Sequence, residues 1–148
     1  MIDIEDVFKW LDVAGIQCED SLSQRALGLS ILDEEFKELW QGLVTGDKKE
    51  IMDGGTDFLW VFANNLRFHG ISLEEFLEYA KKVSESNWSK FCSTLEEAQE
   101  TIDAYQEGRH PNKPGELINC YFTKVGDKFV VYRHDGKVMK SINFKEVG

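Results

Sequence analysis

The chain of 148 residues has few cysteines and histidines, the residues that form the disulfides of small secreted domains and bind zinc. Its three cysteines, Cys18, Cys92 and Cys120, lie far apart and form no C-x-x-C pair. Of its three histidines, none lies at a zinc-ligand spacing from a cysteine. These absences argue against a disulfide framework and a zinc site, and they predict reduced intracellular thiols.

Long apolar runs and an excess of basic charge are also missing. No run approaches the about 20 apolar residues that a membrane helix needs, and the acidic start at Asp3, Glu5 and Asp6 lacks the basic residues of a signal peptide. The 17 basic residues are outnumbered by 27 acidic ones, and the net charge of −10 repels nucleic acid polymers. We therefore expect a cytoplasmic protein with neither a membrane nor a nucleic acid polymer as partner. A nucleotide is not excluded, because bound metal inverts the local field.

The pattern of apolar residues predicts a mainly α fold in a single domain, residues 1–148. With 42% hydrophobic residues the chain has enough apolar side chains for a real core. Periodicity and helix-start signals, including Ser72-x-x-Glu75 and Thr94-x-x-Glu97, indicate helices at about 4–12, 21–44, 48–69, 72–86 and 94–108. The period then changes to that of strands. The predicted fold is a four- to five-helix bundle (1–108) with a small C-terminal antiparallel β-hairpin or meander (117–145).

Two acidic clusters lie within the predicted helices. The first is Glu34-Glu35-x-x-Glu38, and the second is Asp53-x-x-x-Asp57. Because residues three or four apart share one face of a helix, each cluster points its carboxylates in one direction. If these two faces oppose each other, the carboxylates repel unless a hard divalent cation neutralises them. Oxygen-only donors favour magnesium, manganese or calcium.

A solvated acidic helix face is the simplest interpretation of the first cluster alone. The second cluster favours a site, because Asp is a poor helix former. Asp57 also directly precedes the apolar run 58–63, where a carboxylate is desolvated unless it is paired or bound to metal. An ion pair with Lys48 or Arg25 is the structural alternative. We expect the apolar run itself to be central in the fold or buried at a subunit interface.

These motifs and their order resemble the all-α nucleotide pyrophosphohydrolase superfamily, which includes MazG-like enzymes, dimeric dUTPases and phosphoribosyl-ATP pyrophosphohydrolases. The signature of that superfamily is E-x-x-E, a gap, and E-x-x-D around magnesium. Glu35-x-x-Glu38 followed by Asp57 is similar to it. The segment 83–91 and the ending 124–138 resemble small phage members, so that the resemblance covers most of residues 20–145.

The resemblance implies a magnesium-dependent nucleoside triphosphate pyrophosphohydrolase, which cleaves the α–β phosphoanhydride to give a nucleoside monophosphate and pyrophosphate. Mn²⁺ is a possible substitute for Mg²⁺. The implied metal ligands are Glu35, Glu38, Asp53 and Asp57. Glu34 is implied as an extra ligand or as the base that orients the attacking water, and Asn87 and Lys90 as contacts to substrate phosphate. The resemblance also implies self-association into a homodimer or tetramer and, for a phage-encoded protein, a place in the host cytoplasm.

One position departs from the signature. Gly54 stands where E-x-x-D requires Glu, and Asp53 lies one residue earlier, rotated by about 100° around a helix axis. Glu50-x-x-Asp53 has the required spacing one turn earlier. The departure leaves open a catalytically impaired module on the same fold that binds a nucleotide or a protein. A structural bundle with solvent-facing carboxylates is the third alternative.

Overall fold

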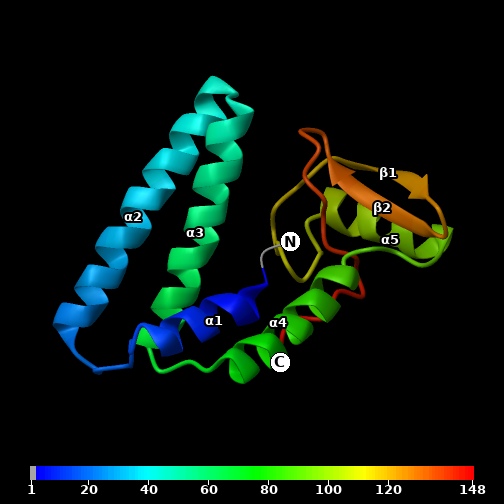
Figure 1. Ribbon diagram of the computed structural model, residues 1–148. Coiled ribbons are helices and arrows are strands. Elements are labelled where there is room, and N and C mark those ends of the chain that lie inside the picture. Colours follow the sequence, from blue (N-terminus) through cyan, green and yellow to red (C-terminus); the bar gives the residue numbers. More distant parts are fainter. Residues whose placement is uncertain (1–2) are drawn as a thin grey trace. The chain divides into compact units, whose positions relative to one another are not determined.

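The structure is a computed structural model that describes residues 3–148, and within them it contains five helices and one two-stranded antiparallel hairpin. The mainly α prediction is therefore confirmed (Figure 1). The elements are α1 (Ile4–Val13), α2 (Leu22–Thr45), α3 (Lys48–Phe68), α4 (Leu73–Trp88), α5 (Leu95–Gln106), β1 (Cys120–Val125) and β2 (Lys128–Arg133). Within the described residues, no helix is both long and apolar enough to cross a membrane.

Internal contacts divide the chain into two compact units. The first ends at Leu77 and holds α1, α2 and α3, and the second runs from Glu78 to Gly148 and holds α5 and the hairpin. Helix α4 begins in the first unit and ends in the second.

Helix starts follow the sequence signals closely. Ser72 and Glu75 form a reciprocal capping box, in which Glu75 N donates to Ser72 Oγ (3.2 Å) and Ser72 N donates to Glu75 Oε2 (2.8 Å). At the start of α5, Thr94 Oγ1 accepts a hydrogen bond from Glu97 N (3.1 Å), while the Glu97 carboxylate accepts from Ser93 N (2.9 Å) rather than from Thr94 N. Both predicted helix starts are thus confirmed. In the second capping box the Glu97 carboxylate binds the backbone N–H of the residue before Thr94.

A tight turn folds α3 back along α2, so that the two helices run antiparallel (Figure 1). Gly46 ends α2 in the left-handed region, with φ of 72°, and Asp47 caps α3 by accepting hydrogen bonds from Lys49 N and Glu50 N. Helix α1 packs against α3 through a core cluster of Val7, Phe8, Leu11, Ala63 and Leu66. The turn is what brings the two acidic helices side by side.

Glycines allow α2 and α3 to approach closely along much of their length. A Cβ atom at position 42 would lie 2.9 Å from Ile51 N, and one at position 54 would lie 2.9 Å from Leu39 N. Near the other end, the buried Asn65 side chain donates from Nδ2 to Gly28 O (3.0 Å). These contacts fix both the spacing and the register of the two helices.

In the second unit, α5 packs against the hairpin. The buried core consists of Cys92, Ala98, Ile102, Tyr105, Val131 and Met139. Strands β1 and β2 pair from Cys120↔Arg133 to Val125↔Lys128. Of the two predicted alternatives, the hairpin is the one observed, and the third strand that a meander requires is reduced to a single bridge between Tyr132 and Val138.

Candidate active site on helices α2 and α3

The first acidic cluster lies on α2, where its members differ in exposure. Glu34 and Glu38 are exposed, whereas Glu35 is half-buried. Its Oε2 atom is buried and has no hydrogen-bond partner within residues 3–148. One oxygen of the Glu35 carboxylate is therefore shielded from solvent and has no hydrogen bond that compensates for its burial.

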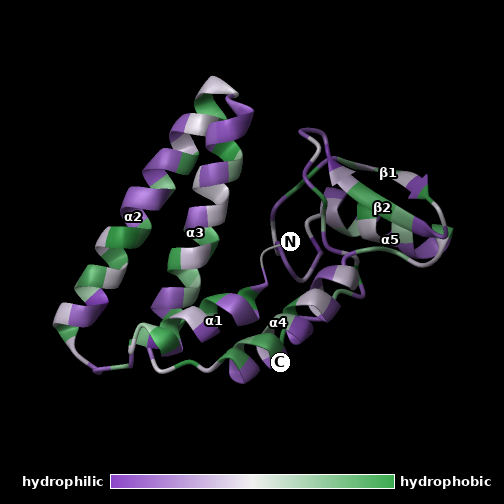
Figure 2. Ribbon diagram, in the orientation of Figure 1, coloured by the Kyte–Doolittle hydropathy of each residue, from purple (hydrophilic) through white to green (hydrophobic). Residues whose placement is uncertain are grey.

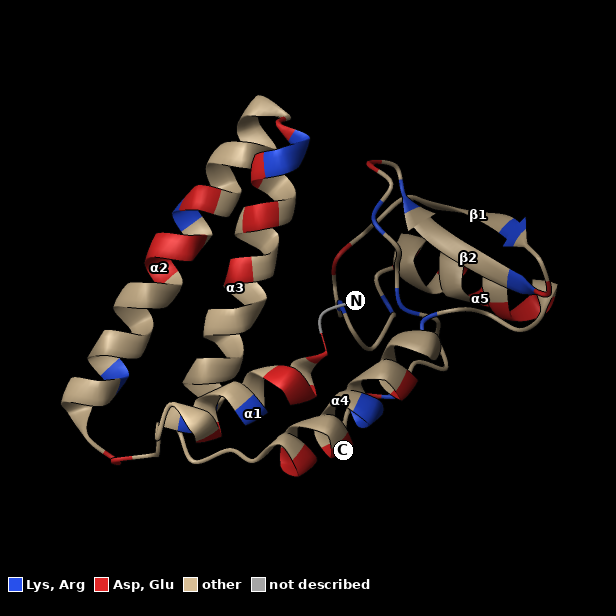
Figure 3. Cartoon of the chain, viewed as in Figure 1, with Lys and Arg blue, Asp and Glu red and all other residues tan. Residues whose placement is uncertain are grey.

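The two acidic clusters meet across the α2–α3 interface. The pKa of Glu35 is raised above its usual value, first by burial and then by the negative charges of Glu38, Asp57 and Glu34. Asp57 contributes from α3, so the Glu35 carboxylate is acted on by charges from both helices. Figure 3 shows acidic residues on the halves of both helices that adjoin the connecting turn.

Asp53 and Asp57 are both exposed. The expectation that the apolar run desolvates Asp57 is wrong, because Trp60 and Val61, which share its helix face, are themselves only partly buried. Neither aspartate makes one of the ion pairs within residues 3–148, and Arg25 instead pairs with Asp20. The apolar run itself is only partly central, since Ala63 is fully buried while Leu59 is 52% exposed.

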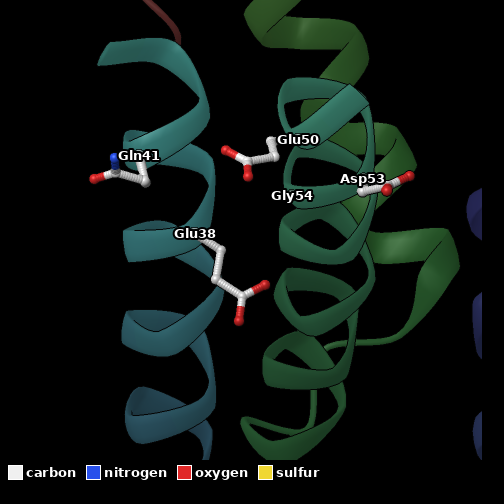
Figure 4. A pocket seen from close by; sticks show the side chains of 5 residues that line it. All are labelled: Glu38, Gln41, Glu50, Asp53 and Gly54. Atoms are coloured by element: carbon white, nitrogen blue, oxygen red, sulfur yellow. The ribbon is translucent and has the colours of Figure 1, made fainter. Parts of the chain in front are cut away.

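A cavity of about 290 Å³ opens beside the cluster and is lined by Glu38, Gln41, Glu50, Asp53 and Gly54. Figure 4 shows the Glu38 and Glu50 side chains reaching into the space between the helices. The Asp53 side chain points away from α2. The sequence signal for Glu50 was its spacing, one helical turn before Gly54.

The packing of α3 against α2 explains why position 54 is a glycine. A Cβ atom there would lie 2.9 Å from both Cα and N of Leu39, which is closer than backbone and side chain atoms approach. A glutamate at this position does not fit between α2 and α3 at their present spacing. The departure from E-x-x-D is thus coupled to the close approach of the two helices.

The fit of a divalent cation follows from the donor set. No group of three or more His, Cys, Asp or Glu side chains is already arranged as a metal site in the part of the chain that the structure describes. The donors are nevertheless all carboxylate oxygens, they repel one another, and one buried oxygen lacks a partner. Such a set suits a hard cation. Glu38 and Asp57 are exposed and can change rotamer to close around it.

Asn87 and Lys90 lie in the second unit, at and just after the end of α4. Asn87 is exposed and lines a cavity of about 420 Å³ together with Trp88 and Phe91, whose rings meet edge to face at 5.6 Å. No hydrogen bond or ion pair engages the Asn87 or Lys90 side chain within residues 3–148. Both polar groups are therefore available to a ligand.

Comparison with protein families matches residues 19–87 to phosphoribosyl-ATP pyrophosphohydrolase, a family of the MazG-like all-α NTP pyrophosphohydrolase superfamily. The matched segment contains α2, α3 and both acidic clusters, and the match confirms the resemblance to that superfamily. No curated protein and no solved structure matches the chain. The match supports a nucleotide pyrophosphohydrolase fold for the α2–α3 segment.

Glu35→Gln is expected to stabilise the metal-free protein. Because the folded-state pKa of Glu35 is raised, its ionised form opposes folding above that pKa, and the penalty fades as the pH falls toward the ordinary value of 4.5. In EDTA at pH 8 the variant should melt higher than the wild type, by about 2–4 °C for each kcal/mol relieved. The difference should vanish near pH 4.

Added Mg²⁺ should stabilise the Glu35→Gln variant less than it stabilises the wild type. Mg²⁺ should raise the melting temperature of the wild type and have a much smaller effect on Glu35→Gln, because binding stabilises only through the ligands present. Differential scanning fluorimetry with and without EDTA measures both effects. A variant that melts below the wild type in EDTA at pH 8 would show that the Glu35 charge is not strained.

Proposed function

We propose that this protein is a magnesium-dependent nucleoside triphosphate pyrophosphohydrolase that produces a nucleoside monophosphate and pyrophosphate. The observation that carries the proposal is the half-buried Glu35 carboxylate. Its negative charge is repelled by those of Glu38 and Glu34 on α2 and of Asp57 on α3, both helices of the family-matched segment. An arrangement that is unfavourable by itself and is relieved by a cation is typical of a binding site rather than of a structural core.

In the proposed mechanism, Glu35, Glu38 and Asp57 hold Mg²⁺, for which Mn²⁺ substitutes. The bound ion supplies a Lewis acid for the phosphoanhydride. Glu34, exposed beside them, orients a water molecule and accepts its proton as the water oxygen bonds to the α-phosphorus. The bond from the α-phosphorus to the bridging oxygen breaks, and pyrophosphate leaves with the electron pair.

Asn87 and Lys90 are proposed to bind the substrate phosphates. The Lys90 ammonium neutralises phosphate charge, and the Asn87 amide donates hydrogen bonds to phosphate oxygens. The positive charge of Lys90 offsets a long-range repulsion, because a chain with a net charge of −10 repels a polyanionic nucleotide.

The test is pyrophosphate release from a panel of NTPs and dNTPs in Mg²⁺, Mn²⁺ and EDTA. The proposal predicts release that requires a divalent cation, with the monophosphate as the second product. The same panel identifies the preferred base and sugar. Binding of a nucleotide without turnover, by a folded sample in saturating Mg²⁺, would instead favour the catalytically impaired binding module.

We further propose that the protein self-associates through α2. Four large apolar residues recur at intervals of seven along this helix and are 47–81% exposed: Leu22, Leu29, Phe36 and Leu43. Figure 2 shows hydrophobic residues recurring along α2. A repeat of seven keeps apolar side chains on one stripe, which a second copy of the helix pair covers in an antiparallel four-helix arrangement.

Sedimentation equilibrium tests this association. The wild type should have at least twice the monomer mass of 17.0 kDa, and Leu29→Glu should be a monomer because it buries a charge in the stripe. Ser30→Glu introduces the same charge at an exposed neighbour off the stripe and should leave the mass unchanged. A monomeric wild type at micromolar concentration would rule out this interface.

A further inference from the structure

The outer edge of β2 is closed by other segments of the second unit. Phe129, Val131 and Arg133 are alternate residues of β2, and each has a backbone hydrogen bond that points away from β1. Their partners are, in the same order, Cys92, Met139 and Lys137, at N···O distances of 2.8–2.9 Å. This side of the hairpin therefore offers little to another strand.

The outer edge of β1 is open. In an antiparallel pair, residues that lie opposite each other direct their backbone groups either toward each other or both away. The register sets Cys120, Phe122 and Lys124 opposite the three outward residues of β2, so their N–H and C=O groups point outward too. Within residues 3–148 none of these groups bonds to another backbone group. The sheet there consists of β1 and β2 alone (Figure 1).

β1 also lacks the features that usually protect an edge strand. It contains one charged residue, Lys124, and no proline, and its six residues pair with β2 without a bulge. Two of its large side chains are exposed, Tyr121 by 48% and Val125 by 55%. A regular, unprotected edge of this kind is a template for a further strand.

β1 is complementary to itself in an antiparallel pairing centred on Phe122. Phe122 then lies opposite Phe122 of the second copy, and Cys120 lies opposite Lys124, so every outward N–H meets an outward carbonyl. The two Lys124 residues are four positions apart along the paired strands, about 13 Å, and salt largely screens their repulsion. Cys120 and Phe122 already pack against the core of the second unit, and the pairing extends this apolar side of the sheet.

We infer that a second copy of this chain pairs with the free edge of β1, antiparallel and centred on Phe122. The two hairpins then form one continuous sheet in the order β2–β1–β1–β2. The surface is separate from the acidic clusters of α2 and α3 and takes no part in the proposed hydrolysis.

The pairing rests on the association through α2 proposed above. A single contact between two strands is marginal by itself. An α2 pair carries two β1 edges, and when two such pairs meet, the second edge contact forms at a high effective concentration. The expected assembly is therefore a tetramer. Leu29→Glu, which lacks the α2 contact, has one edge to offer and should remain a monomer at micromolar concentration.

Sedimentation equilibrium of the full chain and of two variants at Lys124 tests the inference. The wild type should have four times the monomer mass of 17.0 kDa. Lys124→Pro should have half the wild-type mass, because proline removes an outward N–H but none that bonds to β2. Lys124→Ala loses the same side chain and charge, keeps the N–H, and should retain the wild-type mass. Circular dichroism verifies that both variants are folded.

Disulfide formation tests the register without any proline. In the inferred pairing, Tyr121 lies opposite Thr123 of the second copy, with Cα atoms about 4.5 Å apart, which a disulfide can bridge. A mixture of Tyr121→Cys and Thr123→Cys chains should therefore cross-link on mild oxidation. Neither variant alone should do so, since identical positions are diagonal and about 7–8 Å apart. Both chains also carry Cys18→Ser, because Cys18 is exposed.

The outcomes separate the two interfaces. A wild type of twice the monomer mass that Lys124→Pro leaves unchanged would overturn the inference and leave the α2 association standing, with the β1 edge open to an extended segment of another protein. A tetramer that survives Lys124→Pro and shows no cross-link in the mixture would also overturn it. A monomeric wild type would overturn both interfaces, whereas metal-dependent pyrophosphate release tests the proposed function independently.

Discussion

Glu38→Ala is expected to slow metal-dependent pyrophosphate release by more than about 100-fold, because even outer-shell partners of a metal contribute about 10–100-fold. Glu38 occupies the middle of the site. It contributes to the raised pKa of Glu35 and also lines the cavity with Glu50 and Gly54. Initial rates at saturating nucleotide and Mg²⁺ measure the effect.

The comparison variant for this measurement is Glu78→Ala. Glu78 is also an exposed glutamate on a helix, but it lies on α4, away from both acidic clusters in the sequence. It should retain wild-type rates. Because Glu38 is itself exposed, its replacement should leave the fold intact, with a change in stability within about 0.5 kcal/mol. Full activity in Glu38→Ala would contradict its assignment as a ligand.

Gly54→Ala is expected to destabilise the protein, although Ala is the better helix former. The new Cβ would lie 2.9 Å from Cα and N of Leu39, and backbone atoms do not move aside cheaply. Overpacking of this kind costs about 1–3 kcal/mol, which outweighs the roughly 1 kcal/mol that Ala gains over Gly in a helix. Chemical denaturation in EDTA measures the change.

The adjacent glycine provides the internal control. A Cβ at position 55 would lie 3.8 Å from Leu39 Cδ1, an ordinary contact, and would meet nothing closer. Gly55→Ala should therefore stabilise the protein by about 0.4–1 kcal/mol through the unfolded state. The two neighbouring substitutions should have opposite signs. Equal stabilisation by both would mean that α2 and α3 lie farther apart than the structure has them.

Much of the fold follows from local sequence signals. The caps at Ser72 and Thr94 and the turn at Gly46 and Asp47 act within a few residues of themselves, so the sequence alone predicts where these helices begin. The change from helical to alternating periodicity likewise predicts the hairpin.

The third strand that the meander alternative requires does not form, and the reason is tertiary. After the turn at Asp135-Gly136, the Lys137 carbonyl accepts from Arg133 N (2.8 Å) and Met139 N donates to Val131 O (2.8 Å). Pairing then stops, because the buried Met139 side chain joins the core under β2 and the chain leaves the sheet. The sequence pattern therefore predicts that the segment after this turn pairs with β2, but it does not predict how soon the pairing ends.

For the candidate site, helical spacing predicts which carboxylates share a face, and the joint effect of Glu38, Asp57 and Glu34 on Glu35 agrees with it. The exposure of Asp57 was mispredicted, because Trp60 and Val61, the part of the apolar run on the same helix face, are only partly buried. The reason for Gly54 was beyond prediction, since it depends on Leu39 of another helix.

The most direct test of the central claim is the position of water attack. An NTP from the preferred class is hydrolysed in ¹⁸O-labelled water with Mg²⁺, and the products are resolved by ³¹P NMR and mass spectrometry. The account predicts one ¹⁸O atom in the nucleoside monophosphate, unlabelled pyrophosphate and no reaction in EDTA. Nucleoside diphosphate with labelled orthophosphate, or label in the pyrophosphate, would contradict attack at the α-phosphorus and the function proposed for the carboxylates of α2 and α3.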